Sequence, residues 1–259
     1  LDACSIKPRR LVGIGIGSPG VVDTESGVVV EYARIDGLAG YSIRARFEDL
    51  FGVPVFVHNN ASVIAASEYH YETAKEYSSV LAVLVRGGVG AAFVDHGEIF
   101  VNGSTTALEL GRTSVCFSGT EDISADSETL ESVVGEQPLL AMLMERADVT
   151  DWPSVEREMT EQRLASLLAE PADALATAVR NLYHILHPEA VLVISRYEKL
   201  AGVLTAAVAR AVPEVTAIPV PYDPVKACYG ATDLVFQHFL TKPNRTSESR
   251  PLPQSTKAK

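Results

Sequence analysis

Two adjacent asparagines, Asn59 and Asn60, are the first candidates for chemistry because they stand where a strand is expected to meet a helix. The apolar run 55–57 predicts the strand, and the alanine-rich stretch 61–71 predicts the helix. In sheets covered by helices, ligands usually bind at the carboxyl ends of strands. A carboxamide donates and accepts hydrogen bonds, so the pair suits a ligand that carries hydroxyl groups. The alternative is purely structural, since asparagine is a preferred N-cap residue.

Two glycine-rich stretches also invite a chemical interpretation. Gly13, Gly15 and Gly17 form an alternating pattern like part of a dinucleotide-binding fingerprint. That interpretation is excluded, because the run ends in the turn Ser-Pro-Gly at 18–20, no helix opens there, and no acidic residue closes a further strand at the required distance. The second stretch, Arg-Gly-Gly-Val-Gly at 86–90, is expected to form a turn between two strands.

The elements that position these residues alternate at first between strands and helices, and become mainly helical beyond residue 128. Between 80 and 101, short apolar runs separated by glycine turns indicate an antiparallel meander. The pattern is that of an α/β protein with two lobes, the first ending near Tyr77. We expect strands at 11–17, 55–57, 80–85, 91–94, 99–101, 190–195 and 215–219, and helices at 42–50, 61–71, 128–134, 139–146, 154–168, 172–187, 200–212 and 227–240.

The composition is that of an ordinary globular protein. Its 259 residues are 47% hydrophobic and 21% charged, which is enough for a sizeable core. No apolar run reaches the roughly 18 residues that cross a bilayer, and the first ten residues lack the order of a signal peptide, so a soluble cytoplasmic protein without membrane contact is expected. Three scattered cysteines, Cys4, Cys116 and Cys228, favour free thiols over a disulfide framework.

Charge is distributed unevenly along the chain, which has a net charge of −11. Residues 241–259 hold five basic side chains against one acidic one, together with three prolines and few apolar residues, so we expect a disordered tail. The remaining body is more acidic than the total suggests. Because an acidic body repels nucleic acid, contact with DNA is expected only through a segment that is not in this chain.

Several stretches, in order along residues 11–235, resemble the ROK family of sugar kinases and sugar-responsive repressors. They are Gly-Ile-Gly-Ile-Gly-Ser-Pro-Gly-Val-Val-Asp at 13–23, Phe-Gly-Val-Pro-Val-Phe-Val-His-Asn-Asn at 51–60, Gly-Val-Gly-Ala at 88–91, Glu-Leu-Gly-Arg at 109–112, the strand after Leu-His-Pro at 186–188, and Gly-Ala-Thr at 230–232. The resemblance implies a two-lobed α/β fold of the actin/hexokinase (ribonuclease H-like) type. The family's first phosphate loop has no counterpart before Leu11, so the first lobe is expected to be truncated at its N-terminus.

This resemblance and the expected elements together divide the chain into four segments. The second lobe is expected to carry the dimerisation surface of a homodimer, which is what the family resemblance implies. The segments are a remnant of the first α/β lobe at 1–77, the second α/β lobe at 78–226, a C-terminal helix that returns to the first lobe at 227–240, and the disordered tail at 241–259.

The chain departs from the family at positions that serve catalysis and metal binding. Kinases of the family have an Asn-Asp pair whose Asp accepts a proton from the attacking sugar hydroxyl. Asn60 occupies that Asp position, and an amide has no useful basicity near neutral pH, so no catalytic residue is assigned. Arg112 stands where the family's structural zinc site has a His, and the segment 113–131 holds a single cysteine, so no metal is expected.

The nucleotide side of the family pattern is also altered. Gly87, Gly88 and Gly90 are the remnant of a loop whose backbone N–H groups face phosphate in the family's kinases. Those kinases also have two glycines after a later strand, where adenosine approaches the backbone; here that strand ends in Ser-Arg-Tyr at 195–197. Side chains are therefore expected at both places where a nucleotide would approach the backbone, and no cofactor is expected.

The sugar side of the pattern is better preserved. By resemblance, Asn59, Asn60, Glu109 and Glu131 are candidates to bind neighbouring hydroxyls of a sugar. Arg112 favours an anionic ligand such as a sugar phosphate or, alternatively, an ion pair with Glu109 that closes the pocket. The structural alternative for the two glutamates is that they are solvated carboxylates with no ligand.

Three functions remain open at this point. The first is a non-catalytic domain of a ROK-type transcriptional regulator that binds a sugar or sugar derivative as effector. The second is a weak or altered ATP-dependent sugar kinase of the glucokinase type, in which another group replaces the lost base. The third is a scaffold that binds no small molecule.

Overall fold

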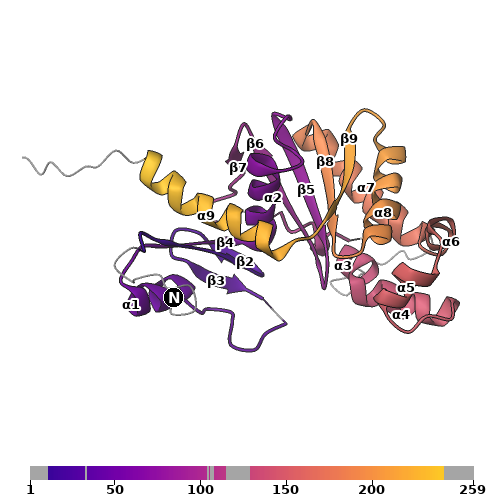
Figure 1. The fold of residues 1–259 in the computed structure, drawn as a ribbon, viewed down its shortest axis with the longest axis horizontal. Coiled ribbons are helices and arrows are strands. Elements are labelled where there is room, and N and C mark those ends of the chain that lie inside the picture. Colours follow the sequence, from indigo (N-terminus) through magenta and orange to yellow (C-terminus); the bar gives the residue numbers. More distant parts are fainter. Residues whose placement is uncertain (1–10, 33, 104, 106–107, 115–128, 242–259) are drawn as a thin grey trace, which may run out of the picture.

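The computed structural model describes residues 11–32, 34–103, 105, 108–114 and 129–241 (Figure 1). The expected disordered tail therefore lies outside the described residues except for Thr241, and so do Cys4 and Cys116. None of the helices among the described residues is both long and apolar enough to cross a membrane.

The described strands form three sheets in two groups. We call residues 11–59 the small lobe and residues 79–221 the large lobe. The small lobe contains a parallel pair, β1 (Ile14–Ser18) with β4 (Val55–Asn59), and an antiparallel hairpin, β2 (Val21–Asp23) with β3 (Val28–Glu31). The large lobe contains a five-stranded sheet, and the helices α2 and α9 lie between the two lobes (Figure 1).

The small lobe is organised so that its strands end beside one another. Helix α1 (Ile43–Phe51) begins at Ser42, whose hydroxyl accepts from the Ala45 N–H, and ends at Gly52 in a left-handed conformation. Its residue Ile43 packs with valines from β2, β3 and β4 in a small core. The parallel register aligns the end of β1 with the end of β4, which brings Ser18 beside Asn59.

Two helices join the lobes through unusually close packing. Residues 61–68 of α2 (Asn60–Tyr71) are all buried, because the helix lies between the five-stranded sheet and α9 (Pro224–Thr241). A Cβ at Gly15 would lie 1.7 Å from the carbonyl oxygen of Ala231 in α9. A Cβ at Gly230 would lie 1.8 Å from the carbonyl oxygen of Val63 in α2. The alternating glycines of β1 thus serve helix packing.

The large lobe has a sheet in the order β7-β6-β5-β8-β9, with antiparallel pairs on one side and parallel pairs on the other. Every residue of β5 and β8 is buried, because α2 covers one face of the sheet and α7 (Ala169–Leu186) and α8 (Glu198–Ala211) pack into the core on the other. The antiparallel meander expected from the glycine turns is present. The strands are β5 (Ser79–Val85), β6 (Val89–Asp95), β7 (Glu98–Ile99), β8 (Ala190–Ser195) and β9 (Thr216–Pro221).

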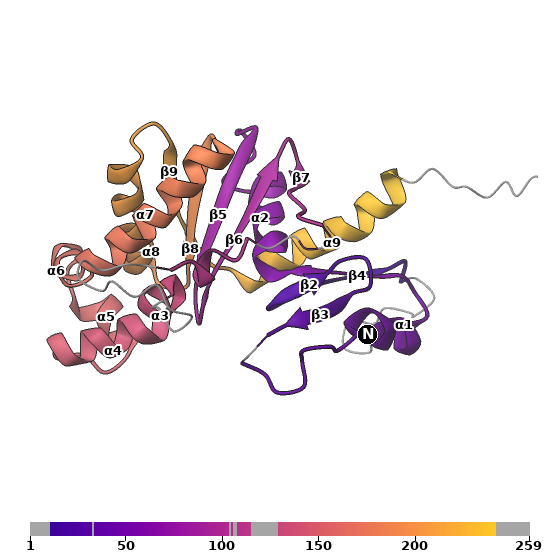
Figure 2. The same cartoon turned by 180° about the vertical axis from the view of Figure 1, so that it is seen from behind.

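Short helices fill the end of the large lobe away from α9, as both views show (Figures 1 and 2). After the 3-10 turn η3 (Leu110–Arg112) and a stretch outside the described residues, the chain resumes before α3. Most of these helices begin next to a glycine or a capping side chain. They are α3 (Leu130–Val134), α4 (Glu136–Arg146), α5 (Trp152–Glu158) and α6 (Glu161–Leu167).

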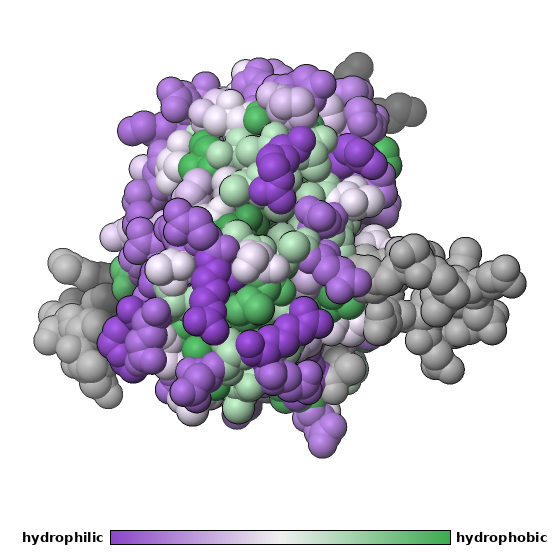
Figure 3. Space-filling model, turned by 90° about the vertical axis from the view of Figure 1, so that its right-hand side faces the viewer, coloured by the Kyte–Doolittle hydropathy of each residue, from purple (hydrophilic) through white to green (hydrophobic). Residues whose placement is uncertain are grey.

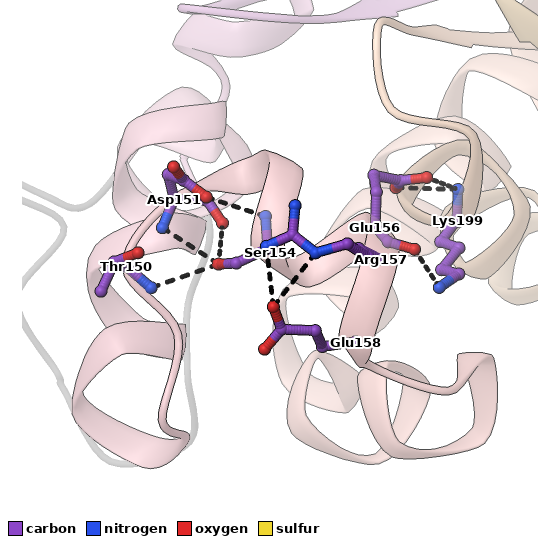
Figure 4. A network of polar contacts seen from close by, with 7 residues as sticks. All are labelled: Thr150, Asp151, Ser154, Glu156, Arg157, Glu158 and Lys199. Carbon is purple, nitrogen blue, oxygen red and sulfur yellow. Dashed lines mark hydrogen bonds and ion pairs between the residues drawn. The ribbon is translucent and has the colours of Figure 1, made fainter.

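The prediction of a single helix at 154–168 is wrong, because the structure has two helices there, α5 and α6. Met159 is extended, and the Thr160 hydroxyl accepts from the Arg163 N–H to begin α6. The ammonium group of Lys199, on α8, donates to the carbonyl of Glu156 in α5 (Figure 4). It also donates to the carbonyl of Met159 at the end of that helix. A cation at a helix C-terminus satisfies carbonyls that lack intrahelical partners, so this contact fixes the end of α5.

Candidate functional site

A cavity of about 510 Å³ lies between the two lobes. Its walls come from the β1–β2 turn and the loop after β3 in the small lobe, from the β4–α2 junction, and from the β5–β6 turn, η3 and α3 of the large lobe. All the residues expected to form a site contribute to its lining: Asn59, Asn60, Gly87, Gly88, Gly90, Glu109, Arg112 and Glu131. The sequence elements that were singled out separately are therefore brought together in one place.

The two asparagines at the β4–α2 junction differ in their environment. Asn59 is only 7% exposed, and its Oδ1 accepts from the Ala61 N–H at 2.7 Å, as an N-cap residue does. Its Nδ2 donates to the Gly20 carbonyl at 2.6 Å. Asn60 is partly buried, and its carboxamide makes no hydrogen bond to another described residue. Asn60 is thus the asparagine whose amide is available to a ligand.

Arg112 is held mainly by a residue that the sequence did not single out. Its two terminal guanidinium nitrogens donate to the carboxylate of Glu31, at the end of β3. This contact lowers the pKa of Glu31 and raises that of Arg112. The expected contact with Glu109 is present but longer, with Nε 3.9 Å from Oε2. Arg112 therefore links the large lobe to the small lobe.

A second ion pair crosses the cleft with the opposite polarity. Arg34, from the small-lobe loop after β3, places Nη2 3.7 Å from Oε2 of Glu131, in the first turn of α3. In one pair the cation belongs to the large lobe, and in the other it belongs to the small lobe. All four side chains are between 38% and 52% exposed, so each pair stabilises the closed arrangement by only about 0–1 kcal/mol.

Glu109 is a carboxylate of the cavity whose pKa is raised above its ordinary value. Partial burial raises its pKa, Arg112 opposes that change, and the negative charges of Glu31 and Glu131 raise it further. A carboxyl group with a raised pKa is closer to the working range of a general base than the Arg112-bound Glu31. At neutral pH, Glu109 is suited to accept hydrogen bonds from ligand hydroxyls.

The glycine turn of the cavity is covered by the Arg34–Glu131 pair. A Cβ at Gly87 would lie 2.9 Å from Nη1 of Arg34, and a Cβ at Gly88 would lie 2.7 Å from Oε2 of Glu131. Gly90 has less need to be glycine, because its Cβ would lie 3.4 Å from that of Ala61. The first two glycines thus let charged side chains approach the turn closely, although a Cβ there would meet only the flexible ends of those side chains.

The end of β8, where the family's kinases have two glycines, is filled by side chains. Arg196 makes a bidentate ion pair with Glu136, whose residue is 3% exposed and whose Oε1 lies 3.1 Å from Nε of Arg196. The following Tyr197 stacks on Trp152, with ring centroids 4.7 Å apart. The indole N–H of Trp152 donates to the Glu136 carbonyl at 3.0 Å. These contacts form a packed corner.

Sequence reasoning missed three cavity residues, Glu31, Arg34 and Arg86, as possible ligands or partners. Glu31 and Arg34 follow a short strand at positions with no distinctive spacing, and only the fold brings them opposite Arg112 and Glu131. In the described part of the chain, no cluster of three or more His, Cys, Asp or Glu side chains is arranged to hold a metal ion.

The sequence matches the ROK family over residues 1–231. Among curated proteins, the xylose repressor of Caldicellulosiruptor bescii is 26% identical over 203 residues, which cover 72% of this chain and 50% of the repressor. The chain thus spans about half the length of that relative.

Solved structures show the same relationship at the level of the fold. A ROK family transcriptional regulator, homologous to the Escherichia coli Mlc protein, has a TM-score of 0.75 and 17% identity, covering 91% of this chain and 64% of the other. A ROK family glucokinase from Streptomyces griseus, in complex with glucose and AMPPNP, has a TM-score of 0.72 and 17% identity, covering 88% and 82%. The expected actin/hexokinase-like α/β fold is therefore confirmed. Since the family match covers most of the sequence, the chain belongs to the ROK family.

Proposed function

We propose that this chain is the effector-binding part of a ROK-type transcriptional regulator and binds a sugar or sugar derivative without phosphorylating it. The observation that carries the proposal is Asn60. It lies at the carboxyl end of β4 in the interlobe cavity, its amide is not used by the fold, and it cannot act as a base. The repressor names of curated relatives support the regulatory role.

The ligand would bridge the two lobes. Asn60 contributes from the β4–α2 junction, while Glu109 and Glu131 contribute from the large lobe. Amide and carboxylate oxygens accept hydrogen bonds from adjacent hydroxyls, which is the pattern of groups that a sugar presents. A ligand that contacts both lobes binds the closed arrangement more tightly than an open one, and so favours closure.

The regulatory proposal also needs a partner and a segment that reads DNA. DNA contact is assigned to a segment outside this chain, and dimerisation is assigned to the large lobe. Figure 3 shows the face of that lobe turned away from α9, where apolar surface runs between hydrophilic side chains. Mixed surfaces of this kind are compatible with a homodimer interface.

Binding is tested by thermal shift and calorimetry with a panel of aldoses and amino sugars. The proposal expects saturable binding of at least one sugar. It also expects Asn60→Ala to weaken that binding about tenfold, the effect of losing one or two hydrogen bonds. Asn181→Ala, at an exposed position of α7, is the matched control and leaves the affinity unchanged. If no sugar stabilises the protein, the scaffold function is favoured instead.

The raised pKa of Glu109 keeps a second candidate function in view, an altered sugar kinase in which this carboxylate replaces the missing base. Incubation with ATP, Mg²⁺ and the same sugars separates the two. The sensor proposal expects no release of ADP above the rate without sugar. Sugar-dependent ADP release that Glu109→Gln abolishes would establish the kinase.

A further inference from the structure

The two carboxylates assigned to the ligand, Glu109 and Glu131, differ in how closely an arginine covers them. Arg112 lies 3.9 Å from Glu109, measured from Nε to Oε2, while its terminal nitrogens donate to Glu31. Glu31 therefore holds Arg112 away from Glu109. Glu131 is instead paired directly with Arg34, whose Nη2 lies 3.7 Å from Oε2. A ligand thus meets one carboxylate that is largely open and one that is already paired.

The guanidinium of Arg34 fills the space between Glu131 and the glycine turn. A Cβ on Gly88 would lie 2.7 Å from Oε2 of Glu131 and 3.2 Å from Nη2 of Arg34. A Cβ on Gly87 would lie 2.9 Å from Nη1 of Arg34. The carboxylate oxygen and both terminal nitrogens therefore converge on the same turn. A ligand hydroxyl that donates to Oε2 of Glu131 needs the place that the guanidinium occupies.

This contact can be exchanged at little cost. The distance of 3.7 Å is too long for a hydrogen bond, and the side chains of Arg34 and Glu131 are 43% and 38% exposed. Ion pairs with such exposure contribute little to stability, because water hydrates both charges when they separate. The other interlobe pair, Glu31–Arg112, does not involve Arg34. Arg34 can therefore leave Glu131 while that pair still links the lobes.

The loop that carries Arg34 is anchored at its far end and exposed at its start. The Gly40 N–H donates to the Val29 carbonyl at 2.7 Å, and the Val29 N–H donates to the Tyr41 carbonyl at 3.1 Å. Leu38 packs against the core of the small lobe. Residues 34–37 are all exposed. The side chain of Arg34 can thus turn into solvent without disturbing that core.

We propose that Arg34 is an internal competitor of the ligand, whose guanidinium pairs with Glu131 in the free protein and is displaced by a sugar hydroxyl. This inference rests on the proposed sugar-binding function and adds a device that sets the affinity of the site. The connection between the lobes is exchanged on binding: Arg34 reaches Glu131 in the free protein, and a ligand held by Asn60 reaches it in the complex. Displacing Arg34 consumes part of the binding free energy, so the natural chain binds the sugar more weakly than the cavity allows.

The test is calorimetric titration of the whole chain with a neutral sugar from the panel that stabilises the protein. Arg34→Ala should bind that sugar about two- to fivefold more tightly than the natural chain, which corresponds to the free energy of one exposed ion pair. Arg34→Lys, which keeps the charge, should lie between the two. Arg46→Ala, at an exposed position of α1 in the same lobe, is the matched control and leaves the affinity unchanged. Thermal unfolding of each variant verifies that the fold is retained.

Salt provides a second readout with a characteristic sign. Raising the ionic strength from about 0.05 M to about 0.5 M screens the exposed Arg34–Glu131 pair, while a neutral sugar carries no charge to be screened. The affinity of the natural chain should therefore rise with salt and approach that of Arg34→Ala. The affinity of Arg34→Ala should change less over the same range. A natural chain whose affinity falls with salt would contradict the competition.

A double-mutant cycle assigns the effect to Glu131. Glu131→Gln removes the charge for which Arg34 and the ligand compete, so adding Arg34→Ala to that variant should not tighten binding further. Tightening of the same size in both backgrounds would show that Arg34 acts without Glu131, and would overturn the proposal.

The remaining outcomes separate this inference from the function on which it rests. Affinity that is unchanged or weaker in Arg34→Ala would overturn the competition and leave sugar binding intact, because Arg34 would then be neutral or a ligand contact. Saturable binding that only Arg34→Ala shows would support the competition in its strongest form. Absence of binding by every sugar, to the natural chain and to Arg34→Ala alike, would overturn both proposals.

Discussion

At the scale of single residues, the β4–α2 junction divides two tasks between chemically identical side chains. Asn59 uses its amide oxygen to cap α2 and its amide nitrogen to hold the β1–β2 turn. Asn60 lines the cavity, and its carboxamide makes no hydrogen bond to another described residue. Of the two interpretations that the sequence left open, capping describes Asn59, while ligand binding stays a prediction for Asn60.

This division of roles predicts that replacing Asn59 and replacing Asn60 change the stability of the protein by different amounts. Asn59→Ala should lower the free energy of unfolding by about 1–2 kcal/mol, because the cap is lost and the Gly20 carbonyl loses its donor. Asn60→Ala should change it by less than about 0.5 kcal/mol. Urea unfolding of both variants measures the difference. Equal destabilisation would mean that the two amides share the structural role.

The partly buried His58, next to this junction, predicts a loss of stability in acid. Burial and the charge of Arg44 lower its pKa from 6.5 to about 4. Between these values the unfolded chain binds a proton that the folded chain does not, so stability falls as the pH drops from 6.5 toward 4, by up to about 3 kcal/mol. Nδ1 of His58 is buried without a partner in the described residues, which agrees with a neutral ring.

The pH dependence of unfolding in the variant His58→Gln isolates this effect from that of the carboxylates. The variant should lose less stability between pH 6.5 and 4 than the natural chain. His96→Gln is the control, because His96 is exposed and paired with Asp95. Parallel pH profiles for the natural chain and His58→Gln would contradict the assigned pKa.

At the scale of elements, α9 is positioned by glycines rather than by large side chains. The close contact of Gly230 with the Val63 carbonyl brings α9 against α2, and that of Gly15 with the Ala231 carbonyl brings it against β1. Both contacts involve backbone, which cannot rotate away as a side chain can. The position of α9 relative to the β4–α2 junction therefore depends on the absence of a Cβ at two places.

Substitution of these glycines tests the packing directly. Gly230→Ala should destabilise the protein by about 1–3 kcal/mol or more, because overpacking against backbone forces α9 to shift. Gly202→Ala, in the middle of α8 with open space around its Cβ, should instead stabilise it by about 0.5–1 kcal/mol through helix propensity. Thermal unfolding compares the two; a stabilising effect at Gly230 would be inconsistent with the contact.

Local sequence predicts most helices and strands. It does not predict contacts made by residues that are distant in the sequence. The junction at Asn59, the meander around 86–90 and the C-terminal helix follow from periodicity and turn residues. The break between α5 and α6 has a local signal that the periodicity overlooked, because Thr160 caps α6. The contact of Lys199, from α8 about forty positions away, with the end of α5 could not be predicted from local sequence. The cavity residues Glu31 and Arg34 were missed for the same reason, since their partners come from the other lobe.

At the scale of the whole molecule, two ion pairs of opposite polarity hold the lobes together at the cavity. Glu31–Arg112 and Arg34–Glu131 are partly exposed, so each is weak and screened by salt. Such contacts allow the lobes to part without a large cost. A ligand that binds between the lobes can then shift the equilibrium between the open and the closed arrangement.

Charge exchange tests this coupling between the lobes. Arg112→Glu should open the cleft, which small-angle scattering or a fluorescence distance between labelled lobes detects, because Glu31 then faces a like charge. Combining it with Glu31→Arg should restore closure through a reversed pair. The opening of the single variant should diminish at high salt. Identical distances in the natural chain and both variants would show that the pair does not control the lobes.

The central claim is that the interlobe cavity binds a sugar or its derivative while the nucleotide approach is closed. Its most direct test is a calorimetric titration of one sample, first with a sugar from the panel that stabilises the protein and then with Mg²⁺-AMPPNP. We predict saturable heat from the first addition, weakened about tenfold by Asn60→Ala, and none from the second. Saturable binding of AMPPNP to the ligand-bound protein would contradict the account.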